Sequence, residues 1–194
     1  MILYFIIIAI SLAIIIVTNI AFTSIGAGNI VLHAFLNLII VVGIDAIIAW
    51  IVHSIPEKRI HPFKKFYIIS KTEKKFYEKL GVRKWKTKIP ESGKYLCNFA
   101  KDKVEDPNNN EYVLKFLRET CYAEIMHFIS IFFGFLSLAF MPYKLSIVLP
   151  IVSVNAILQL LPVIVQRYNR VRLISLYNYN EKHKKEILKN EKGW

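Results

Sequence analysis

Residues 119–170 read ETCYAEIMHFISIFFGFLSLAFMPYKLSIVLPIVSVNAILQLLPVIVQRYNR, and this stretch decides the fold of the chain. It holds two long apolar runs, about 120–141 and 145–165, separated by the short segment MPYK. A run of about 20 apolar residues is long enough to cross the hydrocarbon core of a bilayer as a helix. The stretch therefore predicts two membrane-spanning helices that turn back on each other around Pro142.

Two further apolar runs precede this hairpin, about 2–22 and 30–52, and the short segment SIGAGN separates them. The chain has 194 residues, of which 55% are hydrophobic, more than a soluble domain usually carries. The first run is long for a signal peptide and has no basic segment before it, so we interpret it as a retained span. The sequence predicts an all-α, polytopic membrane helix bundle of four spans, folded as a single integral-membrane domain over residues 1–194.

The basic residues are concentrated in two segments, the loop 53–119 and the tail 167–194. Residues 54–120 carry a net charge of +8 and residues 167–194 a net charge of +5, out of +12 for the whole chain. Cytoplasmic segments of membrane proteins carry the excess of lysine and arginine. We therefore expect a multi-pass protein of the cell membrane with both termini in the cytoplasm.

The loop contains HPFKKFYIISKTEKKFYEKLGVRKWKTKIPE, residues 61–91, in which aromatic residues alternate with lysines. This composition is typical of an interfacial or re-entrant element whose aromatics face acyl chains while its lysines face anionic headgroups. A basic cytosolic loop without a specific ligand is the alternative. The expected partners are membrane lipids rather than nucleic acid, because a basic aromatic segment tethered at a bilayer has this simpler explanation. The oligomeric state stays open.

Glu124 and His127 lie within the third apolar run and three residues apart, so they share one face of the expected helix. Ionisable groups in hydrocarbon are costly, and one that persists there indicates a functional site. A histidine with a carboxylate partner is a general base, because the carboxylate fixes the imidazole tautomer and stabilises the imidazolium. We expect His127 to be a catalytic base that Glu124 orients.

The fourth run carries a second polar face, formed by Asn155, Gln159, Gln166 and Arg170. If the hairpin reverses near residue 143, positions whose numbers sum to about 286 lie level, which places His127 beside Gln159. Asp45 lies at a similar depth in the second run. Amides and an arginine can hold a hydroxyl or stabilise an oxyanion. The alternative for the amides is a hydrogen bond between neighbouring helices.

Two further features of the fourth run bear on this polar face: a proline within it and a polar cluster at its end. Pro162 interrupts it and frees a backbone carbonyl one turn earlier, which then needs a partner at membrane depth. The cluster QRYNR closes the run with Gln166, Arg167, Tyr168, Asn169 and Arg170. Paired arginines among such side chains indicate a site for a lipid headgroup or a phosphate.

The two cysteines, Cys97 and Cys121, have neither a CxxC spacing nor a metal-ligand spacing. We interpret them as free thiols and expect no metal and no cofactor. The roles of Cys121 and Asp45 stay open.

Three blocks of the sequence resemble the glycosyl-4,4'-diaponeurosporenoate acyltransferase family. They are GVRKWKTKIPE (Gly81–Glu91), ETCYAEIMHFISI (Glu119–Ile131) and VNAILQLLPVIVQRYNRVRL (Val154–Leu173). The resemblance covers about residues 45–175. It implies a small bacterial membrane enzyme of the kind that esterifies the sugar of a glycosylated carotenoid with a fatty acyl chain. Its motifs fall on Arg83, Trp85, Lys86, Pro90, Glu119, Glu124, His127, Asn155, Gln166, Arg167, Tyr168, Asn169 and Arg170.

The expected activity is therefore O-acyl transfer to a hydroxyl of a glycolipid or related lipid. Acyl-CoA or another acyl donor is the co-substrate, and the basic residues Arg83, Lys86, Arg167 and Arg170 are candidates for binding its phosphates. Trp85 is a candidate for positioning the lipid. Two alternatives stay open: another lipid-modifying transferase, such as a methyltransferase that uses S-adenosylmethionine, and a non-catalytic lipid-binding or assembly subunit.

Overall fold

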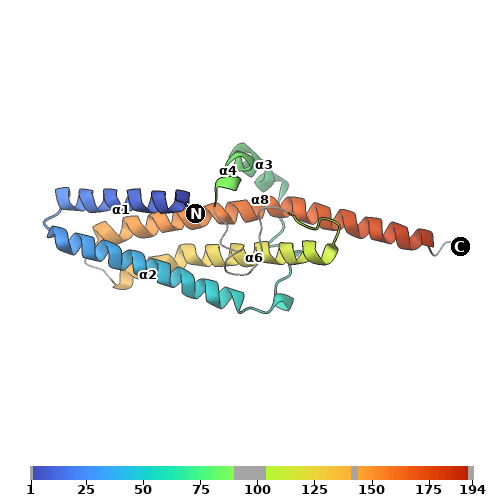
Figure 1. Cartoon of the computed structure of the whole chain (residues 1–194), viewed down its shortest axis with the longest axis horizontal. Coiled ribbons are helices and arrows are strands. Elements are labelled where there is room, and N and C mark those ends of the chain that lie inside the picture. Colours follow the sequence, from blue (N-terminus) through green and yellow to red (C-terminus); the bar gives the residue numbers. More distant parts are fainter. Residues whose placement is uncertain (1, 90–103, 141–143, 192–194) are drawn as a thin grey trace. The chain divides into compact units, whose positions relative to one another are not determined.

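The computed structural model describes residues 2–89, 104–140 and 144–191, and every regular element within these ranges is a helix (Figure 1). Three residues of interest, Pro90, Cys97 and Pro142, lie outside the described residues. The elements are α1 (Ile2–Phe22), α2 (Ala27–His53), η1 (Glu57–Arg59), α3 (Lys71–Lys79), α4 (Val82–Trp85), η2 (Lys86–Lys88), α6 (Asn110–Phe133), η3 (Gly134–Leu136), α7 (Ser137–Phe140) and α8 (Leu145–Glu191).

Among the described residues, four helical segments are long and apolar enough to cross a membrane: Ile2–Phe22, Ala27–His53, Asn110–Phe140 and Leu145–Glu186. The all-α, four-span fold expected from the sequence is thereby confirmed. Two of these helices extend beyond the predicted spans. The helix α6 begins ten residues before the third run, and α8 continues to Glu191. Charged residues end a hydrocarbon-crossing segment without ending a helix, because most of them are good helix formers.

The chain clusters into two compact units. Unit 1 consists of Met1–Ile55 and Ile125–Val163, and unit 2 of Pro56–Glu124 and Ile164–Trp194. Of the three boundaries, one lies between α2 and η1, and the other two fall inside the long helices α6 and α8. The single domain expected from the sequence stays a prediction, and each unit is described by itself below.

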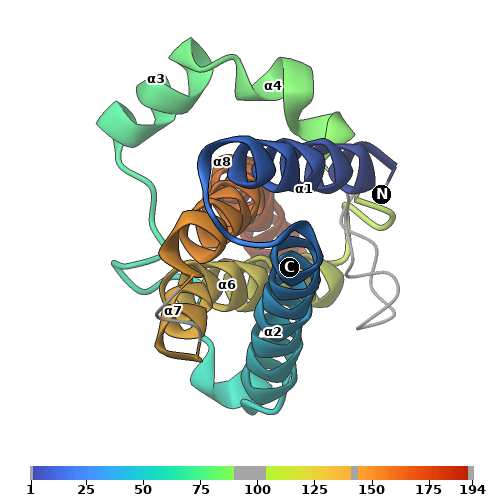
Figure 2. The ribbon, with the colours of Figure 1, turned by 90° about the vertical axis from the view of Figure 1, so that its left-hand side faces the viewer.

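In unit 1, α1 packs along the first part of α8 (Figures 1 and 2). The two prolines of α8 leave the carbonyls of Ser146 and Leu158 without their usual helical donor, since proline has no N–H to offer the residue four positions earlier. The amide of Asn19 donates to the Ser146 carbonyl at 3.2 Å. The Tyr4 hydroxyl donates to the Leu158 carbonyl at 3.1 Å. An unsatisfied carbonyl in hydrocarbon costs several kcal/mol, so these bonds fix α1 against α8.

The predicted break at Pro162 is therefore absorbed within one continuous helix, and the partner that its freed carbonyl requires is Tyr4. Around the Asn19 end, the core of unit 1 consists of aliphatic side chains from three helices. Its buried members are Ile15, Ile30, Ala34, Ile147 and Ile151.

Unit 2 contains the short helices α3 and α4 and the polar parts of α6 and α8. The side chain of Ser70 caps α3 by accepting the N–H of Glu73, in the S-x-x-E spacing of a capping box. Gly81 turns the chain from α3 into α4 with a φ of 64°, a left-handed conformation that glycine adopts without strain (Figure 2). Val113, Phe116 and Leu117 of α6 pack against Leu173 of α8. This packing explains why α6 begins before its apolar run.

Candidate functional site

A chain of three polar side chains crosses unit 1 from α2 to α6. Gln159 of α8 is its centre: its Nε2 donates to Oδ2 of Asp45 at 2.6 Å, and its Oε1 lies 2.5 Å from Nδ1 of His127. The predicted level of His127 with Gln159 is confirmed by this contact. We call these three residues the relay.

The relay fixes the tautomer of its histidine. A carboxylate only accepts hydrogen bonds, so the amide nitrogen of Gln159 faces Asp45 and its oxygen faces His127. The imidazole must then carry a proton on Nδ1 in order to donate to that oxygen. In the neutral ring, the lone pair is left on Nε2, which is the nitrogen suited to accept a proton.

Two further side chains approach the carboxylate end of the relay. Ser130, which is buried on α6, and Asn155 of α8 both approach Asp45. A Cβ added to Gly134 would lie 3.2 Å from Nδ2 of Asn155, tighter than most real contacts. The absence of a side chain at Gly134 therefore leaves the room that Asn155 occupies.

Unit 2 holds a different cluster, which has two arginines and two glutamates. One oxygen of the Glu124 carboxylate accepts from Nη1 of Arg167 and the other from Nη1 of Arg170. Arg170 is 0% exposed, and its Nε donates to Oγ1 of Thr120 at 2.9 Å. Its Nη1 also donates to the Tyr67 carbonyl, and its guanidinium lies 5.3 Å from the centre of the Tyr67 ring. We call this set the ion cluster.

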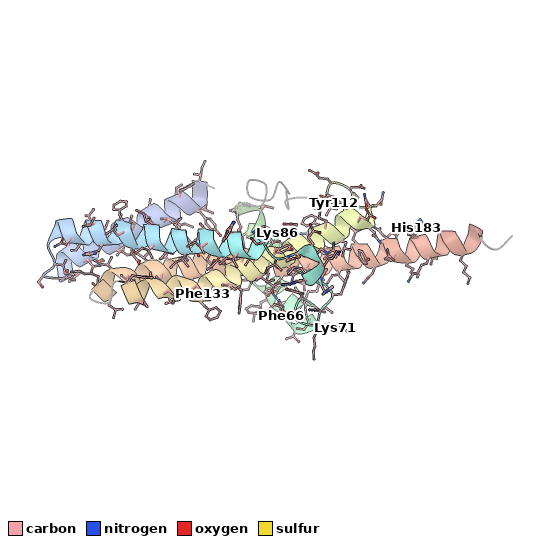
Figure 3. All side chains as sticks on the ribbon, turned by 90° about the horizontal axis from the view of Figure 1, so that it is seen from below. Phe66, Lys71, Lys86, Tyr112, Phe133 and His183 are labelled. Atoms are coloured by element: carbon pink, nitrogen blue, oxygen red, sulfur yellow. The ribbon has the colours of Figure 1, made fainter. Side chains whose placement is uncertain are left out.

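Glu73 of α3 completes the ion cluster with a two-pronged contact to Arg167. Nε and Nη2 of Arg167 donate to the two carboxylate oxygens of Glu73 at 2.5 and 3.0 Å. The hydrogen bond from Arg167 holds the pKa of Glu73 below its usual range. The Tyr77 hydroxyl donates to a carboxylate oxygen of Glu73. Burial, together with this hydrogen bond, raises the pKa of Tyr77 to about 12. The contact ties α3 to α8, and a further bond from Nη1 of Arg167 to the Phe66 carbonyl ties the segment that precedes α3 to α8 as well. Figure 3 labels Phe66 and Lys71 at the two ends of that segment.

The remaining candidates in unit 2 lie on α4, η2 and α8. Nζ of Lys86 donates to Oδ1 of Asn169 at 2.6 Å and lies 5.4 Å from the centre of the Tyr168 ring. The indole N–H of Trp85 donates to the Leu80 carbonyl at 3.2 Å, and Arg83 is exposed. The structure thus brings Lys86 together with the QRYNR segment, as a shared phosphate site requires.

The sequence predicted that Glu124 orients His127 as a catalytic base. In the structure, each of the two side chains has hydrogen-bond partners other than this one. Both oxygens of Glu124 accept from arginines, whereas Nδ1 of His127 donates to Gln159. The pairing itself stays a prediction. Gln166 is buried in unit 2, and its Oε1 has no hydrogen-bond partner among the described residues. The free thiol of Cys121 is fully buried.

Asp45 is the residue whose role sequence reasoning left open. It is the one acidic residue in the second apolar run, and its depth matched that of His127, but the rotation of α2 about its axis was not fixed by sequence.

Tyr4 and Asn19 were missed altogether. The two prolines in one apolar run were the available signal, because each predicts a carbonyl that needs a polar partner. Within the described residues, no three His, Cys, Asp or Glu side chains are grouped as metal ligands.

The family model of glycosyl-4,4'-diaponeurosporenoate acyltransferase matches residues 56–179. This range includes His127, Gln159 and the whole ion cluster, whereas Asp45 precedes it. No curated protein and no solved structure matches the chain. The match covers more than half of the sequence and contains the three blocks singled out above. The chain is a membrane protein of the glycosyl-4,4'-diaponeurosporenoate acyltransferase family.

Proposed function

We propose that this protein transfers a fatty acyl chain to a hydroxyl group of a membrane glycolipid, with His127 as the general base. The family match supports acyl transfer to a glycolipid. The single observation that supports the role of His127 is the relay, which leaves the lone pair of a neutral imidazole on Nε2.

In this mechanism, Nε2 of His127 takes the proton of the acceptor hydroxyl while its oxygen attacks the carbonyl carbon of the acyl donor. The tetrahedral intermediate collapses, the bond to the leaving group breaks, and the imidazolium returns the proton to that leaving group. The positive charge on the ring is stabilised through the amide of Gln159 by the carboxylate of Asp45. The amide of Asn155 is the candidate for binding the hydroxyl or the carbonyl oxygen.

We assign the orientation of His127 to Gln159 and Asp45 rather than to Glu124. Glu124 already accepts hydrogen bonds from two arginines. Because its negative charge is paired with theirs, it would stabilise an imidazolium only weakly. Its proposed role is to hold Arg167 and Arg170 in the ion cluster.

For the donor, the proposed contacts are the basic and polar side chains beside the ion cluster. Lys86, Asn169 and Tyr168 form a group in which a cation, an amide and a ring lie together. Arg83 is exposed on the neighbouring α4. Such a group suits the phosphates of acyl-CoA, since lysine and arginine bind phosphate through charge-assisted hydrogen bonds. Arg167, Arg170 and Gln166 stay candidates for this site, and Trp85 for positioning the lipid.

The test is reconstitution of the purified protein in liposomes with labelled palmitoyl-CoA and a set of glycosylated lipids. We expect a labelled lipid heavier by one acyl chain, and we expect His127→Ala to lose it. Parallel reactions with labelled S-adenosylmethionine test methyl transfer. The proposal fails if label is incorporated from S-adenosylmethionine alone. It also fails if wild type and His127→Ala transfer the acyl chain equally well.

A further inference from the structure

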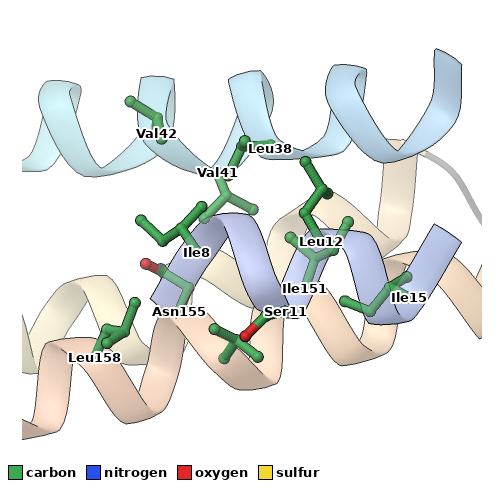
Figure 4. A pocket seen from close by; sticks show the side chains of 11 residues that line it. Ile8, Ser11, Leu12, Ile15, Leu38, Val41, Val42, Ile151, Asn155 and Leu158 are labelled. Carbon is green, nitrogen blue, oxygen red and sulfur yellow. The ribbon is translucent and has the colours of Figure 1, made fainter. Parts of the chain in front are cut away.

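Unit 1 contains a cavity among α1, α2 and α8 (Figure 4). Its lining residues border about 440 Å³ of space outside the protein atoms, a figure that includes space open to the surroundings. Nine of its eleven lining side chains are apolar, among them Leu12, Val41 and Ile151. The two polar ones are Ser11 and Asn155.

The cavity lies between the two hydrogen bonds that fix α1 against α8. Its lining residues on α1 span positions 8–15, between Tyr4 and Asn19. Its lining residues on α8 span positions 151–158, between the two prolines. Each end of α1 is therefore held by a carbonyl that a proline has freed. Between these two bonds, Ile15 of α1 packs with Ile151 of α8, and both side chains also line the cavity.

One residue, Asn155, connects the cavity with the relay. Asn155 lines the cavity and also approaches Asp45, the carboxylate of the relay. Figure 4 shows its side chain extending from α8 into the cavity, close to Ile8. An amide offers both donors and an acceptor, and it is costly to leave unsatisfied at membrane depth. The cavity thus has a largely apolar lining and one amide that also approaches the carboxylate of the relay.

We propose that this cavity binds the fatty acyl chain that is transferred, with its carbonyl group at Asn155 and its hydrocarbon between α1 and α2. The proposal rests on the proposed function and adds the site of the chain. An occupant must match an apolar wall and one amide, which a hydrocarbon chain ending in a thioester or ester carbonyl does. A sugar would leave several hydroxyls unpaired against apolar side chains, and burying a hydroxyl without a hydrogen bond is unfavourable.

The position of the cavity along the chain gives the proposal a second consequence. Seven of the lining residues belong to α1 and α2, outside the residues 56–179 that match the family. His127, Gln159 and Asn155 lie within the match. The proposed base and its amide partner therefore belong to the matched part. Asp45 and most of the proposed chain site belong to the helices that precede it.

The test is photocrosslinking in liposomes with a palmitoyl chain that carries a diazirine at mid-chain, presented as its coenzyme A thioester. We expect adducts on peptides of α1, α2 and α8 that line the cavity. Leu12→Trp fills the space and should reduce labelling about fivefold to tenfold, as overpacking of one site does. It should also shift transfer toward shorter chains. The matched control is Ile39→Trp on α2, whose native side chain is 66% exposed and which should label like wild type.

Adducts confined to other surfaces overturn the proposal, and so does a cavity that a diazirine phospholipid labels as strongly as the acyl thioester. The adduct map of the wild-type protein decides the question even where Leu12→Trp fails to fold. Labelling does not require turnover, so the two proposals fail separately. Cavity adducts without acyl transfer leave the chain site standing and remove the proposed function. Transfer without cavity adducts does the reverse.

Discussion

The relay and the ion cluster are two polar centres among the described residues, and their ionisable members on α6, His127 and Glu124, lie three positions apart in the sequence. In the ion cluster, Arg167 and Arg170 carry two positive charges and Glu124 and Glu73 two negative charges, and each carboxylate accepts from an arginine. In the relay, Asp45 is the one carboxylate, and an amide lies between it and the imidazole of His127.

The difference shows that a buried ionisable residue has two separate explanations. The charges of the ion cluster are balanced by partners from three helices, so the burial of Glu124 is explained by how it holds those helices together. In the relay, the carboxylate of Asp45 accepts hydrogen bonds from neutral donors. Its negative charge gains an opposite charge only when the imidazole of His127 takes a proton. Proton transfer is therefore expected in the relay, and stability is expected from the ion cluster.

The largest expected effect separates the two centres by activity. His127→Ala should lower the rate of acyl transfer about 10²- to 10⁴-fold, the usual contribution of a general base. Thermal unfolding should change little, because His127 is only partly buried. The matched control is His183→Ala on the exposed end of α8, where the ring stacks on Tyr179. Full transfer by His127→Ala, measured in liposomes, would remove the relay from the reaction.

The second prediction tests the ion cluster by stability. Glu124→Gln leaves two arginines sharing an uncharged side chain, and removing one partner of a buried ion pair costs about 3–5 kcal/mol. We expect a marked loss in the free energy of unfolding, measured in detergent. Glu78→Gln breaks the exposed pair with Lys74, whose side chains are each 52% exposed, and should cost about 1 kcal/mol or less. Equal losses in both variants would contradict the distinction.

The third prediction concerns the connection within the relay. Asp45→Asn removes the charge that stabilises the imidazolium, and Gln159→Leu removes the link between them. Each should reduce the rate about tenfold, which corresponds to about 1.4 kcal/mol in the barrier. Because both act through the same link, the double variant should be no slower than the slower single variant. Rate losses that multiply would show that Asp45 and Gln159 act independently.

The sequence predicted the four spans because hydrophobic length is a local property. It also predicted His127 beside Gln159, since a short turn between antiparallel helices fixes their relative level. It did not predict that Gln159 contacts Asp45, because α2 is not connected to the hairpin by a short turn and its rotation depends on packing. The contact of Glu73 with Arg167 joins residues 94 positions apart and depends on how the loop folds. Helix ends were missed where charged residues continue a helix.

The fourth prediction is a pH dependence confined to the ion cluster. The lowered pKa of Glu73 means that its bond to Arg167 stabilises the fold fully above the unfolded value of about 4.3. The contribution is lost as the pH falls from there through the folded value. Glu73→Gln should therefore unfold more easily than wild type by about 1 kcal/mol at pH 7. The gap should close in acid, measured by thermal unfolding across pH; a gap that stays constant would contradict the assignment.

The smallest expected effect returns to the relay. Gly134→Ala places a Cβ 3.2 Å from Nδ2 of Asn155, so the amide must shift by a few tenths of an ångström. If Asn155 holds substrate beside the relay, such a shift should slow transfer about twofold to threefold, because positioning errors below 1 Å already reduce rates. Folding should be unaffected, since the contact is with the end of a side chain that can move.

The matched control is Gly43→Ala on α2, where an added Cβ meets no atom within 4 Å. Alanine replaces glycine inside a helix with a gain of about 0.5–1 kcal/mol, so this variant should be as stable as wild type or more stable, with unchanged transfer. The two variants make the same chemical change on two helices and differ in whether Asn155 is touched. Slower transfer in Gly134→Ala alone supports the placement of substrate at Asn155. Equal rates in both show that the amide tolerates displacement, and they would leave His127, Gln159 and Asp45 as the whole of the site.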